Sequence, residues 1–210
     1  MESRRAESFS DGVFAVAITV LVFNLLPIAQ PGFTQHSVTA VAWPQYVAYA
    51  VSFLTIGIMW LNHHTMLAHI VRVDRMTLVL NLFALMGIVA VPFPTALVAN
   101  SFARNAWPDA RQVAAVSYGI LMIAIAICYS GMWQYLAAHQ DTLADKPMRP
   151  PRSATLRFTA GTAGYVACVF LAAFGLPDAA LVGYALLAVY YLFEHLPAPG
   201  GQPANERPPG

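Results

Sequence analysis

Charged residues are scarce in this chain and are missing from long stretches of it. Lys, Arg, Asp and Glu make up 10% of the 210 residues, against about 25% in an average soluble domain. Charge-free stretches separate Asp11 from Arg72, Arg75 from Arg104, Arg111 from Asp141, Arg157 from Asp178, and Asp178 from Glu194. A bilayer-crossing helix needs about 20 apolar residues. The pattern excludes a soluble enzyme, a nucleic-acid-binding protein and a disordered adaptor, and it predicts an all-α polytopic membrane protein.

Cysteine and catalytic motifs are also lacking. The two cysteines, Cys128 and Cys168, fall in the middle of expected spans and are predicted to be small buried apolar residues rather than a disulfide. The net charge of +1 gives no sign of a nucleic-acid partner. The sequence contains no nucleophile elbow, no HExxH helix, no paired intramembrane carboxylates and no TVGYG filter. We therefore expect no catalytic residues and no cofactor.

The charge-free stretches accommodate six transmembrane helices. We expect these spans at about residues 8–26, 43–71, 77–102, 112–139, 158–174 and 179–196. The sixth has a charge-free stretch of 15 residues, or about 22 Å of helix, which suits snorkelling flanks or a locally thinned bilayer. Residues 1–196 are predicted to form one six-helix transmembrane domain, and the Pro- and Gly-rich segment 197–210 a disordered tail.

The distribution of Lys and Arg predicts the orientation of the spans. Six spans leave both termini on one side, and that side would carry nine Lys and Arg residues, against only Arg104 and Arg111 on the other. The positive-inside rule then places both termini in the cytoplasm, and we expect the chain in the inner (plasma) membrane of a cell. Glu2, Glu7 and Asp11 argue against a cleaved signal peptide at the basic start.

The first span opens with a polar segment and continues as a one-sided apolar helix. Spacing alone favours a capping box, with Ser8 as N-cap and Asp11 three residues later. Further along, one face of the helix carries Gly12, Val16, Thr19, Val20 and Phe23. Such a stripe is ordinarily a helix–helix contact. If several subunits placed it around a common axis, it would form stacked apolar rings of the kind that gate pores by dewetting.

The second and third spans carry polar residues at about the membrane depth of the opening segment. Trp60 and His64 are four residues apart and share one helix face, and Asn81 is expected to hydrogen-bond between helices. These groups and the Arg5 to Asp11 segment are predicted to satisfy one another. An alternative is a metal or haem site built from His63, His64 and His69, but adjacent histidines point about 100° apart on a helix.

Four motifs, taken together, resemble a known family. Arg5-x-x-x-Phe9-Ser10-Asp11 matches the RxxxFSD signature of the transmembrane protein 175 family of cation channels. Trp60 with His63-His64, Leu80-Asn81-Leu82 and Pro92-Phe93-Pro94-Thr95 resemble that family's second and third spans. The resemblance is dense in motifs from about Arg5 to Asn100 and only architectural beyond.

The resemblance implies a homotetrameric, potassium-permeable channel without a P-loop, with K⁺ as the permeant ion and the lipid bilayer as its surroundings. It implies a pore lined by the first span of each subunit, with a constriction at Val16, Val20 and Phe23 and Thr19 as a polar ring beside them. It also implies a network that braces the pore helix, comprising Arg5, Phe9, Ser10, Asp11, Trp60 and His64 (or His63), to which we add Asn81.

Three positions depart from the family pattern. Val16 is smaller and Phe23 bulkier than the residues usual there, so we expect the narrowest ring to lie further outward. Asn24 stands where relatives often have an acidic residue, which would weaken the attraction of cations. The alternative hypothesis is a proton-coupled secondary transporter in which Asp11 and His64 titrate as a pair.

Overall fold

The structure is a computed structural model that describes residues 3–29, 43–68, 70–102, 106–143 and 152–194. Every element within these ranges is a helix. In chain order they are α1 (Ser3–Val20), the 3₁₀ helix η1 (Leu21–Ala29), α3 (Trp43–Leu67), α4 (Arg75–Ala90), α5 (Pro92–Asn100), α6 (Ala110–Ala138), α7 (Gln140–Leu143), α8 (Arg152–Ala173) and α9 (Pro177–Glu194). The expected tail, residues 197–210, lies outside the described residues.

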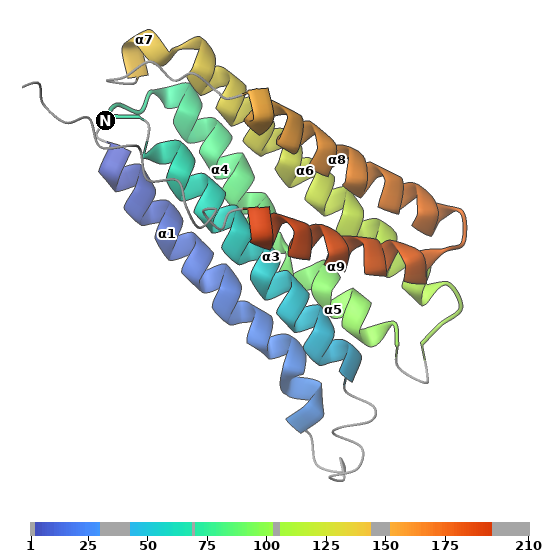
Figure 1. The fold of residues 1–210 in the computed structure, drawn as a ribbon. Coiled ribbons are helices and arrows are strands. Elements are labelled where there is room, and N and C mark those ends of the chain that lie inside the picture. The colour runs from blue at the N-terminus through green and yellow to red at the C-terminus, as the bar shows by residue number, and fades with distance from the viewer. Residues whose placement is uncertain (1–2, 30–42, 69, 103–105, 144–151, 195–210) are drawn as a thin grey trace, which may run out of the picture.

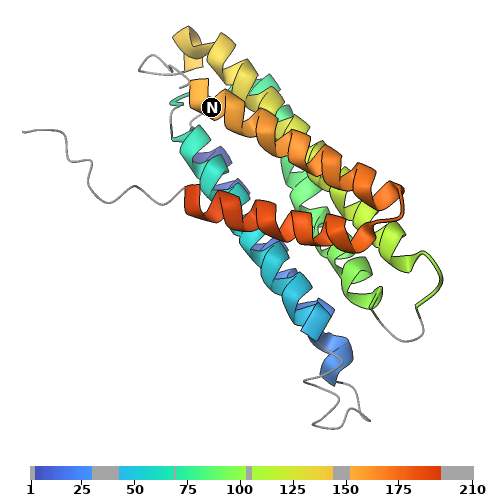
Figure 2. The same ribbon diagram turned by 45° about the vertical axis from the view of Figure 1, so that its right-hand side comes forward.

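The helices form an elongated bundle with α6 in its interior and α1 at one edge. Helix α6 packs against α4, α5, α8 and α9, whereas α1 packs chiefly against α3 and α4 (Figure 1). The start of α1, the end of α3, the starts of α4 and α8 and the end of α6 share one end of the bundle. Helix α9 crosses α3 obliquely, as Figure 2 shows from another side. Among the described helices, none covers the remaining face of α1.

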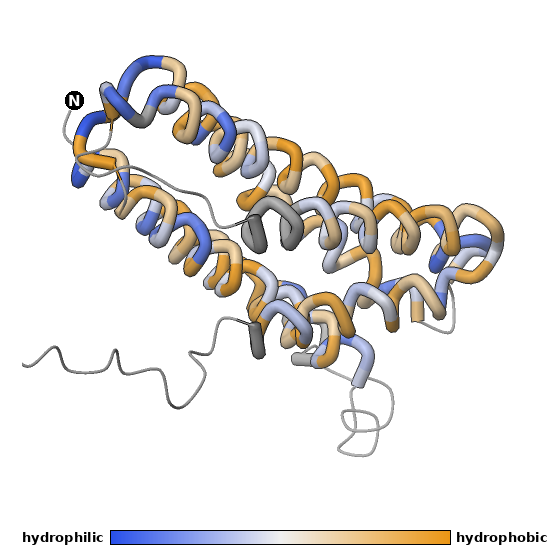
Figure 3. Tube along the Cα trace, turned by 45° about the horizontal axis from the view of Figure 1, so that its top comes forward, coloured by the Kyte–Doolittle hydropathy of each residue, from blue (hydrophilic) through white to orange (hydrophobic). Residues whose placement is uncertain are grey.

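Four of the helical segments are long and apolar enough to cross a bilayer, namely Ser3–Leu25, Trp43–Leu67, Arg75–Asn100 and Ala110–Ala138. Two shorter apolar helices follow, at Thr159–Ala173 and Pro177–Leu192. Hydrophilic residues gather towards the two ends of the bundle and hydrophobic ones along its length (Figure 3). The arrangement is that of an all-α membrane protein, with helices close to the six spans that the charge-free stretches predict.

Several span boundaries differ from the sequence-based prediction. Helix α1 begins at Ser3, so the capping box at Ser8 is wrong: the Ser8 hydroxyl donates to the Arg4 carbonyl one turn earlier, within the helix. Helix α3 ends at Leu67, short of the expected Val71, while α8 begins at Arg152, six residues before the expected start. The reason is that charge-free length measures the bilayer core, whereas a helix can continue into the polar layer.

The third span breaks at Pro92, the first of its two prolines. Helix α4 ends at Ala90 and α5 starts at Pro92, with Val91 between them donating its N–H to Ile88. Proline has no N–H for the helical ladder and is tolerated in the first turn of a helix. The Pro92 carbonyl accepts a hydrogen bond of 3.1 Å from the Asn24 side chain of η1. This contact ties the outer part of the first span to the break.

Asp74 organises the end of the bundle where α3, α4, α6 and α7 meet. Its carboxylate caps α4 by accepting from the Thr77 N–H at 2.9 Å and from the Thr77 hydroxyl, and it also accepts from the Tyr135 hydroxyl of α6. Partial burial raises the pKa of the Asp74 carboxyl, but the hydrogen bonds from Thr77 and Tyr135 outweigh it and leave that pKa below its ordinary value. The N–H of Val71 pairs with the Leu143 carbonyl of α7.

A tight turn joins α8 and α9. Gly175 has φ of 85°, a left-handed conformation that favours glycine. Its N–H bonds to the Ala172 carbonyl, and the N–H of Leu176 bonds to the Leu171 carbonyl, which is the Schellman pattern that ends many helices. Pro177 then opens α9 at a position suited to proline. The turn fixes α9 against α8.

Candidate functional site

Helix α1 has two opposite faces with different surroundings. Its buried face recurs at three- and four-residue steps through Ala6, Ser10, Phe14, Ala17 and, in η1, Leu21. This spacing places all five on one side of the helix, where α1 meets α3 and α4. Ser10 is fully buried among these apolar neighbours. The buried face therefore needs hydrogen-bond partners for a polar group at membrane depth.

Ser10 begins a buried hydrogen-bond chain that crosses three helices. The Ser10 hydroxyl donates to the Ala6 carbonyl at 2.8 Å, so its oxygen can only accept from elsewhere. The Asn81 amide of α4 donates to that oxygen at 3.0 Å, and the Asn81 carbonyl oxygen lies 2.7 Å from His63 Nε2 of α3. The direction of each bond follows: His63 donates to Asn81, and Asn81 donates to Ser10.

This chain of hydrogen bonds assigns the tautomer of His63. Because the Asn81 oxygen accepts, the hydrogen of the neutral His63 ring must sit on Nε2. The other ring nitrogen, Nδ1, has no hydrogen-bond partner. The fully buried ring packs against Phe14 of α1, with centroids 5.4 Å apart, and against Tyr129 of α6 at 6.2 Å. His63 is thus held in one orientation by α1, α4 and α6 together.

A second set of polar contacts joins α1 to α3 nearer the surface. Asp11 accepts a hydrogen bond of 2.8 Å from the indole N–H of Trp60. His64 Nδ1 lies 2.9 Å from the Glu7 carboxylate, and the His64 ring stacks on Trp60 with centroids 5.9 Å apart. Asp11 and His64, the hypothetical titrating pair of a transporter, therefore have different partners. We name the residues of both sets, Glu7, Ser10, Asp11, Trp60, His63, His64 and Asn81, the polar cluster.

Two of the predicted network residues lie apart from the polar cluster. Arg5 and Phe9 are exposed on α1, Phe9 with 55% of its surface accessible. Within the described residues, neither makes a hydrogen bond or ion pair with the cluster. His69, part of the alternative metal site, lies outside the described residues. No group of three or more His, Cys, Asp or Glu residues in the described ranges is placed to hold a metal ion.

Reasoning from sequence missed two contributors to the site, Glu7 and Tyr129. A signal for Glu7 is present: it precedes Asp11 by four residues, just as Trp60 precedes His64. Two antiparallel helices with such pairs can join 11 to 60 and 7 to 64. The contact between Tyr129 and His63 had no signal, because it depends on the packing of α6 against the α1–α3–α4 group. The motif did not show whether His63 or His64 joins the network. In the structure, His63 belongs to the buried hydrogen-bond chain and His64 to the set nearer the surface.

Beyond Asp11, the other face of α1 is apolar and uncharged, and no described helix covers it. Val16 and Phe23 expose 56% and 59% of their surface, and Gly12 and Thr19 are exposed with them, while Val20 is half-buried at the edge of this face. The Thr19 hydroxyl turns back to the Val16 carbonyl at 2.9 Å. Because side chains three apart eclipse in a 3₁₀ helix, Phe23 stands above Val20. We name Gly12, Val16, Thr19 and Phe23 the exposed α1 face.

Asn24, which follows the exposed α1 face, does not continue it. Its side chain is half-buried and donates to the Pro92 carbonyl of α5 at 3.1 Å. The amide is thus engaged inside the subunit. Chemically, the site offers a bare apolar surface on one side of α1 and, on the other, a hydrogen-bond network that is satisfied except at His63 Nδ1. Such an arrangement can exclude or pass ions, but it presents no nucleophile or acid–base group towards the exposed face.

Comparison with known proteins places these features among ion channels. A family model described as "Endosomal/lysosomal potassium channel TMEM175" matches residues 5–92. A potassium channel of Streptomyces collinus is 42% identical over 201 residues, covering 94% of this chain and 95% of its own. A potassium channel of Chamaesiphon minutus is 40% identical over 157 residues, covering 70% and 72%.

A solved structure also matches along nearly the whole length. It is the crystal structure of a lysosomal potassium-selective channel TMEM175 homolog from Chamaesiphon minutus, similar to this chain with a TM-score of 0.74 and 30% sequence identity. The match covers 91% of this chain and 97% of that one.

Proposed function

The chain belongs to the TMEM175 family of potassium channels and is a multi-pass membrane protein rather than an enzyme, and from this premise we propose that it is a potassium-permeable channel whose pore is lined by α1. Four subunits place the exposed α1 face around a common axis. Val16, Val20 and Phe23 then form apolar rings, with Thr19 beside them. The observation that carries this proposal is the exposed, uncharged α1 face opposite the buried face that meets α3 and α4.

The dimensions of these rings support a short hydrophobic constriction. Val16 and Val20 are separated by about 6 Å along an α-helix, and Val20 and Phe23 by about 6 Å along a 3₁₀ helix. The constriction is thus roughly 12 Å long, well below the bilayer core of about 30 Å. An ion must lose water only over this distance, and a ring of branched or aromatic side chains can close the path by dewetting. No cofactor or coupled reaction is required.

The polar cluster supplies the brace that such a pore helix needs. It joins the buried face of α1 to α3 at Asp11–Trp60 and Glu7–His64, and to α4 at Ser10–Asn81. The bonds fix the rotation of α1 about its own axis, which decides which side chains face the pore. Arg5 and Phe9 lie on the exposed side of α1, where a neighbouring subunit in the assembly would meet them.

Charge supports the proposed orientation in the plasma membrane, with residues 1–196 as one six-span domain. Exposed Arg4, Arg5, Arg72 and Arg75 lie at the end of the bundle that holds the start of α1. The positive-inside rule assigns that end to the cytoplasm. Asp109, Arg111 and Asp178 lie at the opposite end. The relatives that match over most of their length come from bacteria, which fits a plasma-membrane location.

Ion flux into liposomes containing purified protein tests the proposal. We expect potassium flux without a carrier, several-fold altered in rate or in preference over sodium by Val16→Ala or Phe23→Ala, because each removes a ring. Val20→Ala should change flux less, since Val20 lies at the edge of the exposed α1 face. Val89→Ala is the matched control, a valine 50% exposed on α4. Equal currents in all four variants and the wild type would remove α1 from the pore.

A further inference from the structure

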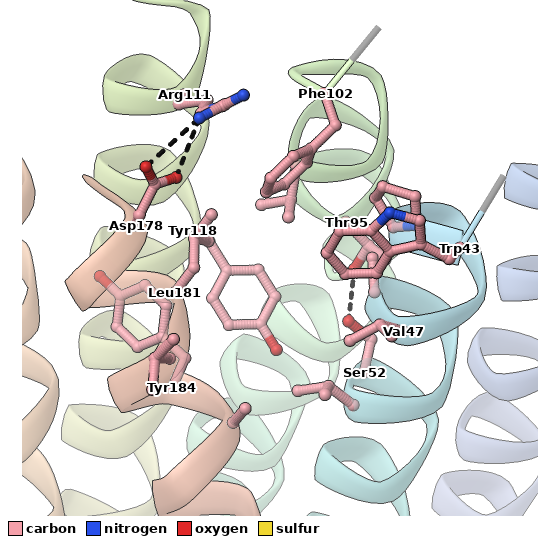
Figure 4. A pocket seen from close by; sticks show the side chains of 16 residues that line it. Trp43, Val47, Ser52, Thr95, Phe102, Arg111, Tyr118, Asp178, Leu181 and Tyr184 are labelled. Carbon is pink, nitrogen blue, oxygen red and sulfur yellow. Dashed lines mark hydrogen bonds and ion pairs between the residues drawn. The ribbon is translucent and has the colours of Figure 1, made fainter. Parts of the chain in front are cut away.

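A cavity of about 410 Å³ lies between α3, α5, α6 and α9, away from α1 and the polar cluster (Figure 4). It is lined by the first halves of α3 and α9, together with residues of α5 and α6. Small-molecule sites are typically about 300–1,000 Å³, mostly apolar and furnished with a few polar groups. The side chains of Trp43, Val47, Val98, Leu181 and Val182 give this cavity apolar walls. Its size and lining fit a small organic molecule.

The base of the cavity holds a buried hydroxyl without a partner. Tyr118 of α6 is 4% exposed, and among the described residues its hydroxyl makes no hydrogen bond of normal geometry, although the hydroxyls of Ser52 and Thr55 lie nearby. Figure 4 shows this hydroxyl pointing into the space towards Ser52 and Thr95. The other tyrosine of the lining, Tyr184, donates to the Ala115 carbonyl at 3.0 Å. Because this hydroxyl is unpaired, its hydrogen is available for a bound group. Pairing it would remove the cost of burying an unsatisfied hydroxyl.

Ser52 offers the complementary acceptor. It is 1% exposed, and its hydroxyl lies 2.8 Å from that of Thr95. Thr95 uses its own hydrogen on the Val91 carbonyl, so Ser52 must be the donor between the two hydroxyls. The lone pairs of the Ser52 oxygen stay available. A ligand group that accepts from Tyr118 and donates to Ser52 meets both needs, and an alcohol does this with one oxygen.

Charge at the mouth argues against an ionic ligand head at the base. Among the described residues, the only charged side chains of the lining are Arg111 and Asp178, which pair with each other at 3.3 Å and are solvent-exposed. Arg111 also lies over the Phe102 ring, 4.7 Å from its centroid. A carboxylate or ammonium beside Tyr118 would be buried without a counter-charge, which is expensive. A neutral head is therefore favoured.

We propose that this cavity is a binding site for a neutral, mostly apolar alcohol, whose hydroxyl bonds to Tyr118 and Ser52 while its hydrocarbon body lies against α3, α5 and α9. The site is separate from the proposed pore, and its occupancy does not depend on ion conduction. Val182 of α9 lines the cavity and is 59% exposed, so that a larger side chain at this position would narrow the entrance.

Photolabelling of the full chain in lipid nanodiscs tests the site, with a diazirine-bearing 1-octanol as probe and mass spectrometry to locate adducts. We expect adducts on the α6 and α9 segments around Tyr118 and Val182, suppressed by excess 1-octanol. Val182→Trp should reduce them at least tenfold by filling the space. Leu186→Trp, one turn further along α9 and 63% exposed, is the matched control and should leave them unchanged.

The role of the hydroxyl is tested separately. Tyr118→Phe keeps the ring and should weaken protection by 1-octanol about two- to tenfold, the effect of one lost hydrogen bond. Tyr129→Phe, another buried tyrosine of α6, should not. The proposal is overturned if octane protects as well as 1-octanol, which would indicate a groove for lipid chains. It is also overturned if adducts spread over all the helices, or if Val182→Trp is labelled like the wild type.

Discussion

Asn81 shows how much depends on one amide in the middle of a membrane protein. It is 3% exposed, accepts from His63 of α3 and donates to Ser10 of α1. The Ser10 hydroxyl already donates to the Ala6 carbonyl, and His63 is fully buried against Phe14 and Tyr129. Neither residue can therefore replace Asn81 with water as its hydrogen-bond partner. Asn81 therefore sets the relative rotation of three helices, two of which have no other buried polar contact with α4 at this depth among the described residues.

Replacing Asn81 with Leu should destabilise the protein by about 1–3 kcal/mol, because two interhelical hydrogen bonds are lost and buried polar groups stay unpaired. Thermal unfolding of the purified protein in detergent measures this. Asn24→Leu is the control: Asn24 makes one bond, to the Pro92 carbonyl, and is only half-buried. A shift in melting temperature at Asn24 as large as that at Asn81 would contradict the special position of the Asn81 amide.

At the residue scale, sequence reasoning found candidate positions but not every partner. The RxxxFSD motif and Trp60 pointed to a meeting of α1 with α3, and Asp11 does contact Trp60. Glu7 was missed because its role follows from the register in which two antiparallel helices pair. Ser8 was misplaced as a cap because a hydroxyl can also bond back to the preceding turn of its own helix, as it does to Arg4.

At the scale of elements, the break between α4 and α5 and the turn between α8 and α9 show two ways in which a helix ends. Pro92 and Pro94 made the break predictable from sequence, since proline removes ladder hydrogen bonds. The long 3₁₀ helix Leu21–Ala29 was not predictable, because runs of more than three or four residues in this form are uncommon. It changes which side chains share a face beyond Val20.

The α8–α9 turn yields a prediction for Gly175. Gly175→Ala forces a Cβ into a left-handed conformation, φ of 85°, and should cost roughly 1–2 kcal/mol. We expect a melting temperature lower by several degrees in detergent. Gly131→Ala is the control, since Gly131 lies within α6 with open space around its Cβ position, where alanine is the better helix former. A lower melting temperature at Gly131 with no change at Gly175 would refute this account of the turn.

At the scale of the whole molecule, the uncovered face of α1 is the feature that a single subunit leaves unexplained. The charge-free stretches predicted the helices, but they could not say that α1 would stand at the edge of the bundle with Val16 and Phe23 exposed. That outcome arises from the preference of α6 for α4, α5, α8 and α9. In the proposed assembly, equivalent positions of α1 in neighbouring subunits come close around the axis.

Cysteine cross-linking tests this arrangement. In a chain with Cys128 and Cys168 replaced by alanine, Phe23→Cys should give, on oxidation in membranes, covalent dimers in high yield, because equivalent Phe23 positions face one another across the pore. Val89→Cys, on the outer side of α4 and 50% exposed, should give few. A long amine- or carboxyl-reactive cross-linker, applied to the wild-type chain without oxidation, should give no covalent species larger than four subunits. Equal dimer yields at positions 23 and 89 would count against a central α1.

The short turn at Gly175 also bears on how the chain reaches the bilayer. Only Phe174, Gly175 and Leu176 separate α8 from α9, and none of them is charged. Because three residues leave no slack between the two helices, α8 cannot cross the bilayer first and wait for α9. The two helices must therefore leave the translocon together, as one hairpin. The two shorter apolar helices thereby share the cost of entry into the bilayer.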